Sequence, residues 1–220
     1  MKLAALCLLL LLAAAPCRAW IRVEAPPAAS LEWVAEDMVY NGVPMRIQFF
    51  RSKAAPGEVL AHYRQRWSDG GRKQYVENRL GPWETIARGL GEFFVTVQVR
   101  PTASGGSEGY LAQRPLAVRA TPVLGQGIAL PPGSEVVNDI LNRDIHRPAR
   151  TLLAFNSLPV DANAAFFRER YTRDGWTLAS DAKGRNGGRQ MILRRNGEEL
   201  SLALALRAGR TALGATLAGR

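Results

Sequence analysis

The sequence predicts an α+β fold, built as a tandem duplication of one strand-helix-antiparallel-strands unit. The first observation is an internal repeat, in which residues 44–67 align with residues 148–171 at a constant offset of 104 positions. The densest match sets Tyr-Arg-Gln-Arg-Trp at 63–67 against Phe-Arg-Glu-Arg-Tyr at 167–171. A period of this length indicates two related domains rather than a solenoid, whose repeats are shorter. We expect each unit to be an antiparallel sheet with one helix packed on a face.

The chain divides into four predicted segments. A signal peptide covers residues 1–19, a first α+β repeat 20–118, a Pro/Gly-rich linker 119–133 and a second α+β repeat 134–220. Each repeat has roughly 90 to 100 residues, which is near the common domain size and is enough for one modest core.

The N-terminal segment has the pattern of an export signal. An apolar run follows Lys2, and small residues before Trp20 suit a signal peptidase, so cleavage is predicted between Ala19 and Trp20. The run is shorter than the roughly 20 residues of a membrane-spanning helix, so we expect no stable span after cleavage. Lipidation at Cys17 is an alternative, although Pro16 precedes it. The predicted location is the periplasm or the exterior.

Each unit is expected to open with a strand and a helix. The strands are predicted over 45–51 and 150–156, and the helices begin at Pro56 and near Asp161, a candidate N-cap. Apolar side chains recur at helical spacing in both: Val59, Leu60, Tyr63 and Trp67, then Ala164, Phe167 and Tyr171. Glycines are expected to end the two helices, at residues 70–71 and at residue 175.

Strands follow each helix. The clearest signal is Asn196-Gly197, the preferred centre of a two-residue hairpin turn, between strands predicted over 189–195 and 198–206. The other predicted strands cover 85–88, 93–100, 110–114 and 211–217, with a turn at 89–91. Residues 31–40 and 135–141 precede the two units and fit either strands or short helices.

Charge and cysteine content narrow the class of partner. Without the leader the chain keeps 27 basic and 19 acidic residues, a net charge of +8. This balance favours an acidic envelope protein or another anionic envelope component, and export argues against nucleic acid. Both cysteines lie in the leader, so thiol catalysis and thiolate metal sites are not expected. Arginine predominates over lysine, which suits bidentate anion recognition but also fits the codon usage of a GC-rich genome.

The repeated Arg-x-Arg pairs are the candidate binding residues. Arg64 and Arg66 recur as Arg168 and Arg170 in a duplicate that has otherwise diverged. We interpret them as presenting guanidinium groups to an anionic partner. The alternative is that these arginines lie on the solvated faces of the helices, where the aliphatic parts of their side chains cover the apolar stripe.

No catalytic constellation is convincing. Ser107 lies in a G-x-S-x-G match, and Asp139 or Asp144 and then His146 follow in the order of a hydrolase triad. However, that motif needs a strand before it and a helix after it, and here it falls in a Gly-rich loop. His62 is the other histidine, and neither histidine has a partner at metal-ligand spacing. We therefore predict no cofactor and no metal.

These observations predict an exported, non-catalytic envelope protein with a binding or adaptor role. That role could be accessory to a secretion, pilus or surface-assembly system. The alternatives are a small periplasmic serine hydrolase that uses Ser107, and a binder of anionic lipid or glycan.

Overall fold

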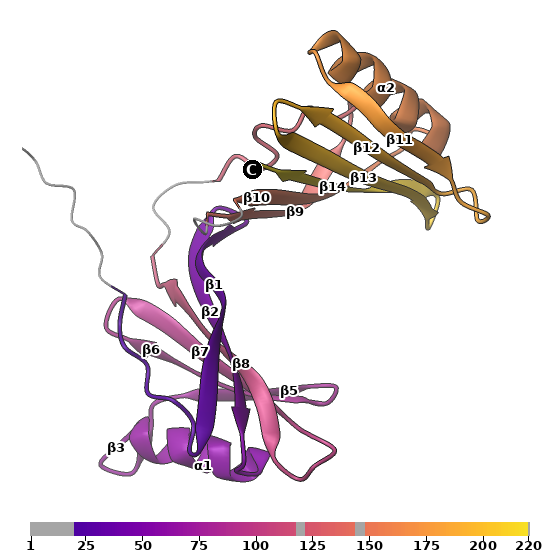
Figure 1. The fold of residues 1–220 in the computed structure, drawn as a ribbon. Helices are drawn as coiled ribbons and strands as arrows, with labels where there is room; N and C mark the ends of the chain where they lie inside the picture. Colours follow the sequence, from indigo (N-terminus) through magenta and orange to yellow (C-terminus); the bar gives the residue numbers. More distant parts are fainter. Residues whose placement is uncertain (1–19, 118–121, 144–147, 220) are drawn as a thin grey trace, which may run out of the picture.

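The computed structural model describes residues 20–117, 122–143 and 148–219. These residues form a mostly-β protein with a 12-stranded antiparallel sheet, a two-stranded hairpin and two helices (Figure 1). The elements are β1 (Ala29–Tyr40), β2 (Val43–Ser52), α1 (Pro56–Arg66), β3 (Ser68–Asp69), β4 (Arg72–Lys73), β5 (Val76–Leu80), β6 (Trp83–Leu90), β7 (Phe93–Pro101), β8 (Ser107–Pro115), β9 (Glu135–Asn142), β10 (Ala149–Asn156), α2 (Val160–Arg173), β11 (Thr177–Lys183), β12 (Arg189–Arg195), β13 (Glu198–Arg207) and β14 (Arg210–Ala218). The large sheet has the order β11-β12-β13-β14-β10-β9-β1-β2-β8-β7-β6-β5. Within the described residues, no helix is long and apolar enough to cross a bilayer.

The first half of the molecule, residues 20–117, has its own hydrophobic core. Helix α1 lies on one face of the strands β2, β8, β7 and β6, and its Tyr63 is fully buried against them. Alternation along β7 places its odd-numbered residues in this core, as the sequence predicts for a half-buried strand. The buried members are Phe50, Val59, Leu60, Tyr63, Trp67, Ile86, Val95, Val97, Val99 and Leu111.

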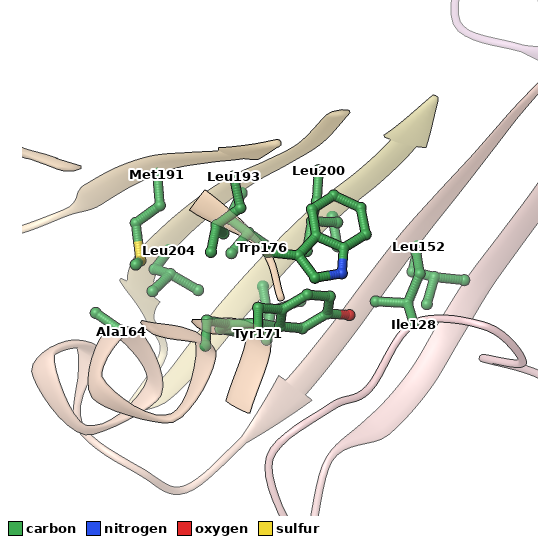
Figure 2. Packing of buried hydrophobic residues seen from close by; sticks show 13 residues of the cluster. Ile128, Leu152, Ala164, Tyr171, Trp176, Met191, Leu193, Leu200 and Leu204 are labelled. Carbon is green, nitrogen blue, oxygen red and sulfur yellow. The ribbon is translucent and has the colours of Figure 1, made fainter. Parts of the chain in front are cut away.

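The second half, residues 122–219, has a separate hydrophobic core, in which α2 packs on the strands β10 to β14 (Figure 2). Leu200, Leu202 and Leu204 of β13 point into the core, whereas Leu206 at the strand end is 65% exposed. The predicted hairpin turn is confirmed, since Asn196 and Gly197 both have positive φ, at 48° and 84°. Helix α2 covers the sheet through a fully buried Phe167.

The two halves share a single sheet, where we expected two separate ones. Strands β1 and β9 pair over only three residues, with Val39 opposite Leu141 at the centre. We call this short ladder the joint. Residues 31–40 and 135–141, which the sequence left undecided, are therefore strands whose ends pair with each other.

Both helices lie on the same face of this continuous sheet. Pro44 of β2 stands opposite Val39 of β1, Val39 stands opposite Leu141 of β9, and Leu141 stands opposite Arg150 of β10. Residues that stand opposite one another point to the same face of a sheet, so Pro44 and Arg150 share a face. Because alternate residues of a strand also share a face, Pro44 points to the side that α1 covers and Arg150 to the side that α2 covers.

Two local expectations need correction. The N-cap of α2 is Pro159, and Asp161 lies in the first turn, where its carboxylate binds Lys183 and an arginine instead of capping backbone N–H groups. Helix α1 ends at Arg66, and residues 70–71 form the turn of the β3–β4 hairpin. Gly175 follows the C-cap of α2, as predicted. The predicted linker packs on the second half, since Ile128 is buried in that core.

Candidate functional site

The arginines predicted on α1 are engaged by carboxylates of their own chain. Arg64 Nε lies 2.7 Å from Glu77 Oε1 of β5. Arg66 Nη2 lies 2.6 Å from Glu24 Oε1, and its Nε donates to His62 Nε2 at 3.1 Å. The side chains of both arginines remain more than 40% exposed.

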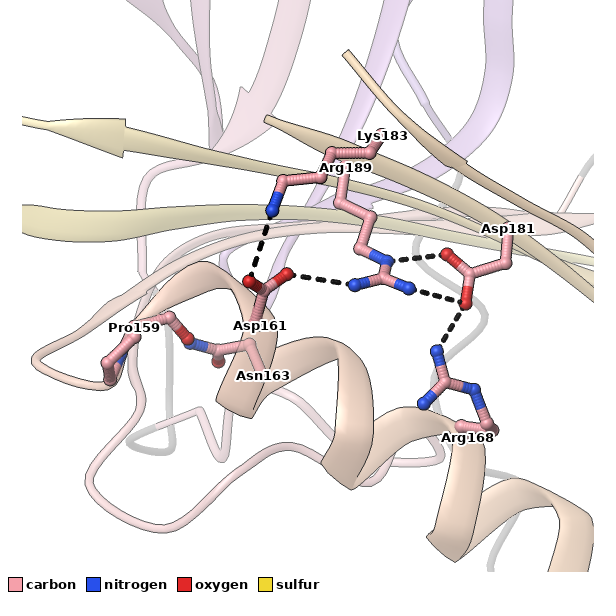
Figure 3. A network of polar contacts seen from close by, with 7 residues as sticks. All are labelled: Pro159, Asp161, Asn163, Arg168, Asp181, Lys183 and Arg189. Atoms are coloured by element: carbon pink, nitrogen blue, oxygen red, sulfur yellow. Dashed lines mark hydrogen bonds and ion pairs between the residues drawn. The ribbon is translucent and has the colours of Figure 1, made fainter. Parts of the chain in front are cut away.

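The arginines predicted on α2 are also paired. Arg168 binds Asp181, which in turn accepts two hydrogen bonds from Arg189, and Arg189 extends the network to Asp161 (Figure 3). Hydrogen bonding from Arg189 holds the pKa of Asp181 below its ordinary value, against an opposing effect of burial. Arg170 Nε lies 3.0 Å from Asp174 Oδ2.

The four arginines do not converge on one site. They lie on two helices at opposite ends of the molecule (Figure 1), and each already has a carboxylate neighbour. An anionic partner would have to compete with these carboxylates, so the anion-binding role stays a prediction.

Ser107 is the first residue of β8, and its side chain is 1% exposed. Its hydroxyl donates to the carbonyl oxygen of Ala54 at 2.8 Å. A loop precedes it and a strand follows it, so the context of a nucleophile elbow is absent here. Asp144 and His146 lie outside the described residues, as do Cys17 and Ala19.

A cleft of about 700 Å³ lies beside the joint. Its walls are mainly apolar, as in most ligand and peptide sites. The lining includes Trp20, Val39, Pro44, Phe93, Pro115, Pro122, Val123, Leu124 and Leu141, with the charged residues Asp37, Asp139, Arg143 and Arg150. Trp20, which follows the predicted cleavage point, stacks on Phe93 with ring centroids 5.2 Å apart.

A buried ion pair forms the polar part of this cleft. Asp139 is 4% exposed, and its two oxygens accept from Arg150 Nε at 2.9 Å and Arg150 Nη2 at 2.5 Å. The amide of Gly125 donates to the same carboxylate at 2.8 Å. Burial by itself would raise the pKa of Asp139, but the hydrogen bonds from Arg150 and Gly125 and the Arg150 charge lower it on balance.

The backbone of Asp139 ties this pair to the first half. Its N–H donates to Asn41 Oδ1 at 2.7 Å, and its carbonyl accepts from the Asn41 N–H at 2.8 Å. Asn41 belongs to the tight β1–β2 turn, where Gly42 lies so close to Pro122 that an added Cβ would be 2.0 Å from the proline Cβ. The cleft is thus held by contacts from both halves.

Sequence reasoning missed the pairing of Asp139 with Arg150. Arg150 aligns with Arg46. In the strand register Asp139 stands opposite Leu152, and Trp33 stands opposite Gln48, the residue that aligns with Leu152. The guanidinium of Arg46 lies over the rings of Trp20 and Trp33, at 5.2 and 5.7 Å, and its Nη2 is 4.0 Å from Glu36 Oε1. The register shifts in β1 prevent a constant sequence offset from relating these positions, so the pair could not be recognised from the repeat alone.

Comparisons with known proteins add no relative. No family model, curated protein or solved structure matches the chain. In the part of the chain that the structure describes, no group of three or more His, Cys, Asp or Glu side chains is placed to hold a metal ion.

Proposed function

We propose that this protein is an exported, non-catalytic binding or adaptor protein of the cell envelope, and that the cleft at the joint holds its partner. The observation that carries the proposal is the combination of apolar walls with the buried Asp139–Arg150 pair. Apolar walls supply affinity, and a few fixed polar groups orient what is bound. The net charge of +8 after loss of the leader favours an acidic partner.

Export rests on the sequence pattern before Trp20. Support from the fold is indirect: Ile21 and Val23 pack against the first core, and Glu24 accepts a hydrogen bond from the buried Tyr63. A chain that begins at Trp20 would therefore keep every residue that this core uses. Sequencing the N-terminus of the protein recovered from the periplasm tests the prediction, and we expect Trp20 as the first residue.

A non-catalytic role is favoured over hydrolysis because the Ser107 hydroxyl is buried and donates to a backbone carbonyl. A serine-directed phosphonate probe is expected to leave the protein unlabelled. Labelling that disappears in Ser107→Ala would establish the hydrolase instead.

We also propose that the two halves descend from one duplicated unit. In support, each half has the order strand, strand, helix and antiparallel strands, and Arg46 and Arg150 occupy equivalent places on β2 and β10. The repeated arginines would then be tested together, by partner binding of Arg64→Ala/Arg168→Ala. Unchanged binding would leave these side chains with a structural role alone.

The experiment for the cleft is crosslinking in intact cells, followed by mass spectrometry of the tagged protein. The variant is Val123→Asp, because Val123 lines the cleft and is 70% exposed, so a charge there should not disturb folding. The matched control is Leu206→Asp at the end of β13, which is 65% exposed and lies outside the cleft lining. We expect a discrete protein partner that is lost in the first variant and kept in the control. Binding of anionic lipid or glycan instead, falling steeply with salt, would favour the alternative role.

A further inference from the structure

The first half has a second sheet surface that no element of the described chain covers. Helix α1 occupies one face, and the even-numbered residues of β7 and β8 point to the other, which we call the open face. It contains an apolar groove of about 410 Å³. The groove is lined by Val34, Met45, Ile47, Thr96, Gln98, Tyr110 and Ala112.

Arginines stacked on aromatic rings border this groove. At one end of the strands, the guanidinium carbon of Arg51 lies 5.3 Å from the ring centre of Phe49. Beside it, that of Arg100 lies 4.6 Å from the ring centre of Trp83. Stacking of this kind holds the guanidinium flat against the surface. Arg100 also donates from Nε and Nη2 to Glu108 Oε1, at 2.9 and 2.6 Å.

The opposite border has the same construction. Arg114 on β8 stacks at 4.9 Å on Phe94 of β7, six residues along that strand from Arg100. Among the described residues, Arg100 is paired with Glu108, whereas Arg51 and Arg114 have no carboxylate partner. Glu108 stands opposite both Arg51 and Arg100 in the register, so it offsets part of the positive charge at that margin, whereas Arg114 at the other margin has no ion pair in the part of the chain that the structure describes.

The dimensions of the groove suit a helix laid across the strands. The row Phe49, Tyr110, Gln98 and Thr85 crosses four strands, which at about 4.8 Å per spacing is about 15 Å, or about ten helical residues. The two arginine margins are about 20 Å apart at 3.3 Å per residue, and a helix with its side chains is about 10–12 Å wide. A helix in the groove would thus have arginines along both flanks.

The second half has a comparable groove on its equivalent face. That groove has a volume of about 400 Å³, and its lining includes the row Thr151, Thr216, Ser201, Ile192 and Ser180. Arg210 lies over an aromatic ring there too, 5.6 Å from the ring centre of Phe155, but it is paired with Glu135. Arg194 on the same face is paired with Glu199. The first half differs because Arg51 and Arg114 have no ion pair among the described residues.

We propose that the open face docks an amphipathic helix of another protein, with apolar side chains toward the groove and Asp or Glu on both flanks. Burial of the apolar stripe would supply affinity, and the carboxylates would meet Arg51 on one side and Arg114 on the other. This inference rests on the face opposite α1 and is independent of the cleft.

The test is site-specific photocrosslinking in cells that express the full chain. Benzoylphenylalanine is introduced in place of Ile47 or Thr96 in the groove, and in place of Ser201 on the second half as the matched control. The crosslinked peptide is then identified by mass spectrometry. We expect adducts from both groove positions to one segment that has apolar residues at i, i+3 and i+4 with Asp or Glu on its flanks. We expect no adduct from the control.

Charge reversal decides whether the arginines take part. Arg51→Glu/Arg114→Glu should lower the adduct yield about tenfold, and Arg51→Gln/Arg114→Gln by less, with circular dichroism confirming that both variants fold. The proposal is overturned by equal yields in these variants, or by the absence of adducts at both groove positions. It is also overturned if the adduct is a second copy of this chain, a glycan, or a basic or extended segment.

Discussion

The Asp139–Arg150 pair permits a quantitative prediction about the stability of the joint. In Asp139→Ala, the guanidinium of Arg150, whose side chain is 19% exposed, loses the carboxylate that takes two of its N–H groups. The amide of Gly125 loses its acceptor at the same time. Removal of one member of a buried ion pair costs about 3–5 kcal/mol, because the remaining charge stays desolvated.

This loss is large compared with the total stability of a domain, which is about 5–15 kcal/mol. For a protein of this size it corresponds to a fall in Tm of roughly 6–20 °C, at about 2–4 °C per kcal/mol. The assay is urea unfolding followed by tryptophan fluorescence and by circular dichroism, since the chain has five tryptophans. Both signals should shift to lower urea in the variant.

Two controls separate the buried pair from a general effect of charge removal. Glu135→Ala breaks the exposed pair with Arg210, whose side chains are 64% and 44% exposed, and should cost less than about 1 kcal/mol. Asp139→Leu/Arg150→Met removes both charges and should cost at least about 2 kcal/mol less than the sum of the single changes. The reasoning is wrong if Asp139→Ala costs under about 1 kcal/mol, or if the double change is additive.

Three further predictions concern packing, buried amides and acid stability. A Cβ on Gly109 would lie 1.9 Å from a backbone oxygen of the next strand, whereas one on Gly214 would meet nothing nearer than 3.9 Å. Gly109→Ala should therefore cost about 3 kcal/mol or more and Gly214→Ala less than about 1, measured by urea midpoints. Asn163 and Asn156 are both buried and exchange two hydrogen bonds, at 2.7 and 3.0 Å. Asn163→Leu should therefore lower the free energy of unfolding by about 3 kcal/mol in the same assay, because Asn156 loses both of these hydrogen bonds in the core. An unchanged free energy of unfolding would contradict this reasoning. The pKa of Asp181 is lowered from 3.8, so its carboxylate stabilises the fold above that pH and this contribution is lost as the pH falls through the lowered value. Asp181→Asn should be less stable than wild type at pH 6, and the difference should shrink as the pH falls below the ordinary pKa of an aspartate; a constant difference would refute the assignment.

Much of the local structure follows from patterns within about 15 residues. The Asn196-Gly197 turn, the alternating leucines of β13 and the stripe on α2 were predictable, because period and turn chemistry are properties of the contiguous chain. The expectation for Asp161 failed because its carboxylate has stronger partners on β11 and β12 than the backbone of its own helix.

The binding surfaces were harder to foresee. The candidate arginines were chosen from recurrence alone, and recurrence does not reveal that Glu77 or Asp181 already lies beside them. Cation–π stacking on the open face joins residues of different strands, such as Arg100 with Trp83. The spacing of residues within one strand cannot reveal a contact between side chains of two different strands.

The sequence by itself determined the helical stripes, the hairpin and the excess of positive charge, since each is carried by neighbouring residues, and it predicted the repeat. The tertiary structure alone decided that the halves share one sheet. Strand β1 shifts register between Trp33 and Ala35 and again between Ala35 and Met38, so its apolar residues do not keep the period of two that identifies a strand. Its partner β9 lies about 100 residues away along the chain. Pairing across that separation depends on the folded halves bringing both strands together, and the cleft exists only because they do.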